Sequence, residues 1–347
     1  MKNWTVLLLL VTYFTSCQLF SQSTDTENNT MMNDHFGLVL HGGAGNMAKK
    51  NLSPELEQQY KETMKQALLV GHKMLQDGKS AVDVVEAVIQ VLEDAPIFNA
   101  GKGAVFTHDG HNEMDAAIMD GKTRDAGAVA NVQHIRNPIS AAKAILQKSK
   151  FVLLSGKGAE KFAQENGVTL VDSSYFFYQP RWDDYLKIKN SKNTKLDHDT
   201  PEGGAELNNK INKFGTVGCV VLDRFGHLAA GTSTGGIANK DYNRIGDSPL
   251  IGAGTYANDE TCAISCTGHG EDFIRGVVAY DIAAQMEYKH RSLKRAVKHT
   301  LEKLTAHKGR GGLIAIDQKG NMIMEFNTNG MFRGNIDQNG LPFVAIY

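Results

Sequence analysis

The side chain best placed for covalent chemistry is Thr216, because of the sequence on either side of it. Residues 184–213 form a polar segment typical of a mobile linker, and the apolar run 216–223 predicts a buried strand. If the bond between Gly215 and Thr216 were cut, Thr216 would carry both a hydroxyl and a free α-amine. An α-amine has a pKa of about 7.7–8.0, so it can take the hydroxyl proton near neutral pH. The spacing fits a self-cleaving threonine nucleophile, but it also fits an ordinary linker that ends at a strand.

Polar, glycine-rich motifs occur in series on both sides of Thr216. They are His41–Gly45, Phe98–Phe106, Met114–Gly121, Gly127–Ala130, Arg136–Pro138, Phe214–Asp223, Ala229–Gly236, Arg244–Pro249, Gly252–Ala257 and Ser265–Glu271. In this order they resemble the isoaspartyl peptidase/plant-type L-asparaginase family of N-terminal nucleophile hydrolases and, more distantly, the glycosylasparaginases. The resemblance runs from about Gly37 to the C-terminus. It implies a precursor that cuts itself after Gly215 into an α chain (36–215) and a β chain (216–347) of one hydrolase domain.

The resemblance assigns catalytic roles to five residues. Thr216 matches the residue of autocleavage and the nucleophile, and Thr234 matches the threonine that hydrogen-bonds near it. Thr267 and Gly268 match the oxyanion hole, where a hydroxyl and a backbone N–H face the developing negative charge. Asn99 resembles the amide that orients the free amine of Thr216. The implied reaction proceeds through a β-aspartyl ester on Thr216.

The resemblance also implies how the substrate is held. Arg244 would clamp the α-carboxylate through a bidentate pair, next to Thr267 and Gly268. Asp247 would hold the α-ammonium group, helped by the carbonyl of Gly270. L-Asparagine and β-aspartyl (isoaspartyl) dipeptides both offer these two groups beside the scissile amide, and both would release L-aspartate. The residues do not rank the two substrates, and they leave glycosylasparaginase activity open.

No cofactor is expected for this chemistry, but the resemblance implies a structural sodium ion. Its ligands would be the backbone carbonyls of Leu92, Glu93, Ala95, Phe98, Ala100 and Lys102. The resemblance further implies self-association as α2β2. A sequence pattern cannot reveal a carbonyl cage, so the sodium site depends on the resemblance alone, and the same loop could equally be ordered without an ion.

Two residues depart from the family pattern near the expected pocket. Asn243 stands where a glycine usually precedes the arginine, and His269 stands where a threonine is common in the asparaginase branch. These departures put the preferred substrate in question rather than the chemistry. A lone loop histidine is more often a surface residue than a pH-sensitive contact, and we expect the former for His269.

Three other classes of function compete with this one. The run 231–235 fits the G-x-S-x-G elbow of serine esterases around Ser233, but a polar, turn-like segment follows it where an elbow requires a helix. The run 43–48 fits a dinucleotide-binding fingerprint, but the next helix start is Ser53. An inactive exported binding protein with the same fold is the third alternative. Metal binding by His108 and His111, which flank a predicted hairpin turn, is not expected.

The order of predicted elements indicates how these residues are positioned. An early strand (36–40), helices at 53–78, from Ser80 and at 138–147, and C-terminal helices at 271–289 and 292–306 alternate with pairs of strands. The predicted strands are 216–223 with 228–234, 261–267, 313–316 with 322–326, and 343–347. This order suits two sheets packed face to face with helices outside, and not a simple parallel sheet. We therefore expect a four-layer αββα sandwich.

The N-terminus has the pattern of a targeting segment. A basic residue and an apolar run of about ten residues, too short for a membrane span, predict a signal peptide over 1–21, followed by a disordered leader over 22–35. We expect export to the periplasm or medium, with lipid anchoring at Cys17 as an alternative after a lipoprotein signal over 1–16. The formal net charge of −1 argues against nucleic acid as a partner. Three further cysteines make no disulfide framework, and we expect them to be buried thiols.

Overall fold

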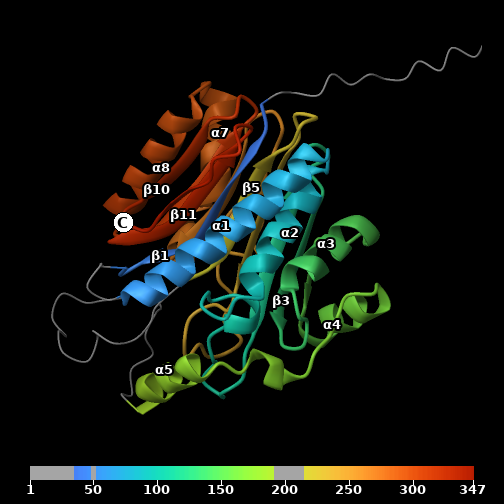
Figure 1. Cartoon of the computed structure of the whole chain (residues 1–347), viewed down its shortest axis with the longest axis vertical. Helices are drawn as coiled ribbons and strands as arrows, with labels where there is room; N and C mark the ends of the chain where they lie inside the picture. Colours follow the sequence, from blue (N-terminus) through green and yellow to red (C-terminus); the bar gives the residue numbers. More distant parts are fainter. Residues whose placement is uncertain (1–34, 48–51, 191–214) are drawn as a thin grey trace, which may run out of the picture. The chain divides into compact units, whose positions relative to one another are not determined.

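The computed structural model describes residues 35–47, 52–190 and 215–347 (Figure 1). The predicted signal peptide, Cys17 and all of the leader but His35 lie outside the described residues, as does the linker from 191 to 214. Among the helices that are described, none has the length and apolar character of a membrane span.

An eight-stranded sheet joins the two halves of the sequence. Its order is β12 (Phe343–Ala345), β11 (Gly330–Asp337), β1 (Gly37–Gly45), β5 (Val217–Leu222), β6 (Leu228–Thr234), β2 (Met114–Asp120), β3 (Ala126–Val132) and β4 (Leu153–Ser155). Neighbours are antiparallel except β3 and β4, which are parallel. Because β1 pairs with both β5 and β11, the motif 41–45 lies beside the strand that Thr216 precedes.

A second sheet has four antiparallel strands. Its order is β10 (Met322–Phe326), β9 (Gly311–Asp317), β8 (Cys262–Gly268) and β7 (Thr255–Ala257). Strand β8 corresponds to the strand predicted over 261–267, and its last residues are Thr267 and Gly268. The second sheet therefore carries the two predicted oxyanion residues at one strand end.

Helices flank both sheets. They are α1 (Pro54–Gln76), α2 (Ala81–Glu93), α3 (Pro138–Lys148), α4 (Gly156–Glu165), α5 (Gln179–Asn190), α6 (Gly270–Gly276), α7 (Val278–Lys289) and α8 (Leu293–Ala306), with 3-10 turns at Gly101–Gly103 (η2) and Ser173–Phe176 (η3). Both predicted caps are confirmed, since Ser53 accepts from the N–H of Leu56 and Ser80 from that of Asp83. In Figure 1, α1 and α2 lie side by side, and α8 lies beside β10. Helix α1 packs against β1 and β11, and α2 packs against β5 and β6.

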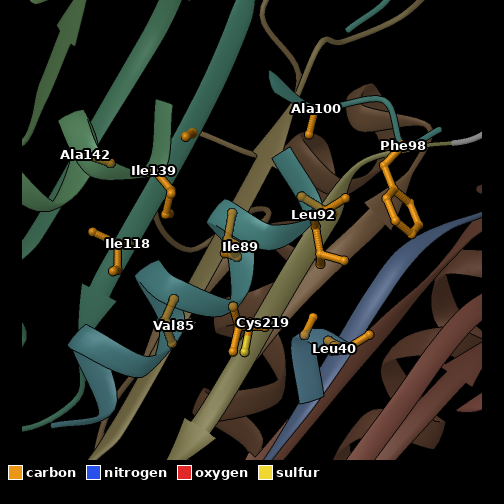
Figure 2. Close-up of a cluster of buried hydrophobic side chains, with 14 of the residues drawn as sticks. Leu40, Val85, Ile89, Leu92, Phe98, Ala100, Ile118, Ile139, Ala142 and Cys219 are labelled. Carbon is orange, nitrogen blue, oxygen red and sulfur yellow. The ribbon is translucent and has the colours of Figure 1, made fainter. Parts of the chain in front are cut away.

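Two apolar clusters hold these elements together. The first lies between the helices α1 to α3 and the eight-stranded sheet, where Val85 and Ile89 of α2 lie beside Cys219 of β5 (Figure 2). The second contains residues of both sheets and of α7 and α8, including Val220 and Ile264. Successive residues of β5 thus face different clusters, as the alternation of a strand requires. Burying this apolar surface is the main force that brings the two sheets and their helices together.

Several predicted boundaries differ from the structure. The linker begins too early, because residues 184–190 belong to α5, where Tyr185 and Ile188 are buried. The single helix predicted over 271–289 is wrong, because Val277 has φ of 46° and separates α6 from α7. Strand β1 continues through the motif 41–45 instead of ending at Leu40. Cys219, Cys262 and Cys266 are free and buried, as expected.

Candidate active site

The site begins at a pair of threonine hydroxyls at one end of β5 and β6. Thr216 directly precedes β5 and is 8% exposed, and its Oγ1 donates to Oγ1 of Thr234 at 3.0 Å. The Thr234 hydroxyl also accepts from the backbone N–H of Gly236 at 3.0 Å. These contacts follow from the register, in which Val217 pairs with Ser233. The two predicted threonines therefore meet.

The residue before Thr216 packs against β1. The pairing of β1 with β11 shifts between His41 and Gly43, and Gly43 has φ of 107°, which favours glycine. A Cβ atom on Gly43 would lie 2.6 Å from the backbone nitrogen of Gly215. Only a glycine at this position lets the two backbones approach so closely. The motif 41–45 thus confines the Gly215–Thr216 junction.

The predicted oxyanion residues lie across β1 from this junction. Thr267 is buried, and its Oγ1 is 3.4 Å from the backbone nitrogen of Ala44, which donates to it. Gly268 is tightly enclosed, since a Cβ there would lie 2.5 Å from the carbonyl oxygen of Arg310. Strand β1 therefore contacts both Gly215 and Thr267, which places the nucleophile and the oxyanion residues around one short segment.

Asn99 supports this region through the turn after β6. Its side-chain amide donates to the carbonyl of Gly236 at 2.7 Å, and its Oδ1 accepts from the N–H of Val105 at 3.0 Å. Its own carbonyl accepts from the N–H of Gly235. Asn99 therefore fixes the turn whose Gly236 N–H in turn bonds Thr234.

Arg244 and Glu271 form a bidentate ion pair that the sequence did not suggest. The Nε and Nη2 atoms of Arg244 each donate to a carboxylate oxygen of Glu271 at 2.9 Å. Burial would raise the pKa of Glu271, but the hydrogen bonds and charge of Arg244 outweigh it and hold that pKa at about 2. The pair fixes one edge of the guanidinium and leaves N–H groups on the other edge for a second carboxylate.

Asp247 lies next to Arg244 and is 5% exposed. A Cβ on Gly270 would meet Nη2 of Arg244 at 2.7 Å and Oδ1 of Asp247 at 3.0 Å, so the three predicted substrate residues meet. Burial raises the pKa of Asp247 to about 7, against the opposing effects of its own N–H and the Arg244 charge. Its Oδ2 atom is buried without a hydrogen-bond partner in the described structure. A buried acceptor of this kind is stabilised by any cation that reaches it.

The two departures from the family pattern have different surroundings. Asn243 has φ of 52°, a left-handed conformation that explains why glycine or asparagine occupies this position. Its side chain donates to Oε1 of Glu113 at 3.1 Å, and its carbonyl accepts from Asn131 at 3.2 Å. His269 is 23% exposed at its side chain and bonds Oδ2 of Asp272 at 3.0 Å, so it is not a free surface residue.

The six carbonyls predicted to hold sodium lie in one segment. Leu92 and Glu93 end α2, Ala95, Phe98 and Ala100 lie between α2 and η2, and Lys102 lies within η2. Two glycines pack closely against this segment: a Cβ on Gly101 would lie 2.5 Å from the oxygen of Glu93, and one on Gly103 would lie 2.0 Å from that of Phe98. Oxygen ligands of this type suit hard cations. No group of three or more His, Cys, Asp and Glu side chains within the described ranges could hold a metal.

The structure does not support the esterase alternative. Ser233 is fully buried on the face opposite to Thr232, and its Oγ donates to Oε1 of Glu93 at 2.6 Å. Burial raises the pKa of Glu93 to about 8, against the opposing effect of the hydrogen bond from Ser233. No helix follows β6 directly, since the next one begins at Gly270. In the described part of the run 43–48, residues 43–45 belong to β1, and the first described helix after them begins at Pro54.

Comparisons with known proteins show what the chain is similar to in sequence. A sequence model described as asparaginase matches residues 34–346. The chain is 47% identical to a putative isoaspartyl peptidase/L-asparaginase of Dictyostelium discoideum, over 91% of this chain and all of that protein. It is 47% identical to the isoaspartyl peptidase of Escherichia coli (89% of this chain, 95% of that one) and 41% identical to a plant-type L-asparaginase of Pyrococcus abyssi (85% and 94%).

Proposed function

This chain belongs to the asparaginase family, and from that premise we propose that it is a self-cleaving hydrolase of L-asparagine and β-aspartyl dipeptides with Thr216 as its nucleophile. The observation that carries the proposal is the hydroxyl pair of Thr216 and Thr234, buried at the start of β5 beside the confined Gly215. The relatives named isoaspartyl peptidase or L-asparaginase support the same reaction class.

Maturation uses the same hydroxyl as catalysis. In the precursor, Oγ1 of Thr216 attacks the carbonyl carbon of Gly215, and the acyl group passes from nitrogen to oxygen. This transfer breaks the amide bond and frees the α-amine of Thr216. Water then hydrolyses the ester, which leaves the Gly215 carboxylate and restores the Thr216 hydroxyl. The close contact between Gly43 and Gly215 supports a backbone held in one conformation for this attack.

In the mature enzyme, the α-amine of Thr216 takes the proton of its own hydroxyl. The oxygen attacks the side-chain carbonyl of the substrate, and the tetrahedral anion is stabilised by the Thr267 hydroxyl and the Gly268 N–H. Ammonia or the amine of a peptide leaves with a proton. Water then hydrolyses the β-aspartyl ester on Thr216 and releases L-aspartate.

The pair of Arg244 and Asp247 would select substrates with a free α-carboxylate and α-ammonium group. Two N–H groups of Arg244 are used by Glu271, and those on its other edge can bind a carboxylate bidentately. An ammonium group would supply the cation that Oδ2 of Asp247 lacks, aided by the Gly270 carbonyl. L-Asparagine, β-aspartyl dipeptides and glycosylasparagine differ only in the amine that leaves. The preference among them therefore depends on the part of the site that receives this leaving group, and competition assays would measure it.

The direct test is the mass of the purified protein beside its Thr216→Ala variant. We expect two fragments from the wild type, the smaller beginning at Thr216, and one uncut chain without turnover from the variant. The expected loss of kcat is at least about 10⁴-fold, because a nucleophile is removed. A single chain in both proteins, with no ammonia from L-asparagine, would replace this proposal with the inactive binding protein.

Four further properties complete the proposal. The two sheets and flanking helices would form a four-layer αββα sandwich, the mature chains would assemble as α2β2, and the loop 92–102 would hold sodium. Sedimentation would measure the assembly, and thermal unfolding in sodium against choline chloride would show whether the loop binds the ion. Export, with or without a lipid at Cys17, follows from the sequence pattern alone, and the mass of the N-terminal peptide from native cells would test it.

A further inference from the structure

Behind Thr216, four buried side chains form a continuous hydrogen-bonded chain between the two sheets. His41 Nδ1 is 3.1 Å from the carbonyl oxygen of Thr216, and its Nε2 is 3.0 Å from Oγ of Ser265. Ser265 lies 2.7 Å from Oγ1 of Thr232, which lies 2.6 Å from Oγ1 of Thr255. All four side chains are fully buried. The catalytic scheme above assigns none of them a role.

The direction of this chain follows from counting protons. Burial lowers the pKa of His41 to about 3, so its ring is neutral and carries one proton. A carbonyl only accepts, so that proton lies on Nδ1 and Nε2 is an acceptor. Ser265 must therefore donate its single hydroxyl proton to His41.

The remaining two bonds are then fixed as well. An oxygen pair at 2.7 Å needs a proton between its members, and since that of Ser265 is used, Thr232 donates to Ser265. By the same reasoning Thr255 donates to Thr232. The carbonyls of Gly254 and Ser248, at 3.3 Å from Thr232 and 3.0 Å from Thr255, are the longer and competing contacts. Three hydroxyls and one imidazole therefore all donate toward the carbonyl of Thr216.

Gly218 provides the space that this chain requires. A Cβ atom there would lie 2.0 Å from Oγ of Ser265 and 2.3 Å from Nε2 of His41. Gly218 pairs with both His41 and Thr232 in the register of the sheet, which places it directly between the strands that carry them. The absence of its side chain is a condition for the bond between His41 and Ser265.

On this basis we propose that His41, Ser265, Thr232 and Thr255 are positioning residues that hold the α-amine of Thr216 in place for catalysis. Thr216 is fixed at two points, its carbonyl by His41 and its hydroxyl by Thr234. The carbonyl carbon, the side chain and the α-nitrogen of Thr216 are all bonded to the same Cα atom. Once the carbonyl and the side chain are held in place, the direction of the bond from Cα to the α-nitrogen is fixed as well. Aligned hydroxyls polarise one another, which strengthens the last bond of the chain. The inference depends on the proposed function, in which this amine is the base.

The test compares two neighbours on β6 that face opposite sides of the sheet. Thr232→Val removes a hydroxyl from the chain at nearly constant volume, Thr232→Ser keeps the hydroxyl, and Ser233→Ala removes one that bonds Glu93 instead. We expect Thr232→Val to lower kcat for a β-aspartyl dipeptide about tenfold with KM within about twofold, because the substrate contacts are unchanged. Thr232→Ser should restore kcat, and Ser233→Ala should retain it.

Two outcomes would overturn the proposal: an unchanged kcat in Thr232→Val, whether or not KM rises, or an equal loss of kcat in Ser233→Ala. Inactive wild-type protein would instead contradict the proposed function. A second measurement does not depend on any variant maturing. Nitrogen NMR of the wild-type protein, assigned with a His41→Gln variant, should show His41 protonated on Nδ1 and not on Nε2. Protonation on Nε2 would reverse the chain and exclude the proposal.

Discussion

The two ends of the layer between the sheets are built from the same strands, yet one end is apolar and the other polar. On the face that each strand turns toward the other sheet, an apolar residue lies two positions along the strand from a polar residue or a glycine. The apolar positions are Val39, Val220, Ala230 and Ala263, and the next positions on the same face are His41, Gly218, Thr232 and Ser265. All eight residues are fully buried or, for Gly218, enclosed. Burial therefore does not distinguish the core from the site, whereas the hydrogen-bond partners of each residue do.

The difference shows what each end requires from its residues. At the apolar end, stabilisation comes from the area removed from water and tolerates changes of shape if volume is kept. At the polar end, each buried hydroxyl must find a partner or lose roughly 1–3 kcal/mol. Because these bonds also hold Thr216, small changes there should alter catalysis as well as stability. The following predictions test that distinction, beginning with the largest effect.

A methyl group added at the polar end should slow maturation strongly, whereas removal of two methyl groups from the apolar end should not. Gly218→Ala forces a Cβ into the bond between His41 and Ser265, and we expect self-cleavage at least about a hundredfold slower, as for a reacting group misplaced by about 1 Å. Val220→Ala leaves a cavity two residues away and should cost about 2 kcal/mol of stability while cleavage stays within about threefold. Intact mass against time gives the cleavage rates, and denaturant unfolding gives the stabilities.

If Val220→Ala slows cleavage as much as Gly218→Ala does, the proposed difference between the apolar and the polar end is wrong. In that case packing throughout the layer, and not the hydrogen-bonded end alone, would control the junction at Thr216. Cleavage is to be compared per folded protein, measured by circular dichroism, because Gly218→Ala also introduces strain.

The apolar end was largely predictable from the sequence, and the polar end only in part. Alternation and caps predict β5, β6, α1 and α2 because these signals are local. The motifs also brought Thr216 and Thr234 together correctly, since their strands are neighbours in sequence. Family resemblance supplied Arg244 and Asp247, whose meeting with Gly270 the structure bears out. Their individual roles remain part of the proposal.

What the sequence did not reveal depends on contacts between distant segments. His41 and Ser265 are 224 positions apart, and nothing near either residue indicates that they meet. The bond of Arg244 to Glu271 likewise requires α6 to start where it does. Helix α5 was missed because its composition is polar, and its place is fixed by the guanidinium of Arg181 bonding the carbonyl of Gly103. Local patterns cannot encode such pairings.

The pH dependence of catalysis should report the protonation of Asp247, a buried carboxyl at the candidate substrate site with an unpartnered oxygen. With a folded-state pKa of about 7 for Asp247, kcat/KM should fall about tenfold per pH unit well below pH 7, because the protonated acid cannot hold an ammonium group. Bound substrate lowers that pKa, so this limb should be absent from the profile of kcat. An identical acid limb in both profiles would assign it to the α-amine of Thr216 instead. Initial rates between pH 5 and 8 provide both curves.

Asp247 also links pH to stability, with a definite sign. Its pKa is raised from 3.8 in the unfolded chain to about 7 in the folded one, so the folded state binds the proton more tightly. Its contribution to stability is full below pH 3.8 and is lost as the pH rises to 7. Asp247→Asn should reduce the slope of stability against pH in this range, and Glu93, whose pKa burial raises to about 8, should account for part of the slope that remains. A variant with the wild-type slope between pH 4 and 7 would show that another group is responsible.

The smallest effect is expected at the margin of the polar end, where backbone conformation matters more than the side chain. Asn243 adopts φ of 52°, so Asn243→Gly should keep KM within about twofold although it loses the bond to Glu113. Asn243→Ala loses the same bond but also forces an alanine into the left-handed region, at a cost of about 1–2 kcal/mol. We therefore expect a severalfold rise in KM for alanine only, because the strained turn displaces Arg244. Equal KM values for the two variants, both above wild type, would show that the bond to Glu113 holds Arg244 in place. In that case the asparagine side chain would itself belong to the polar end.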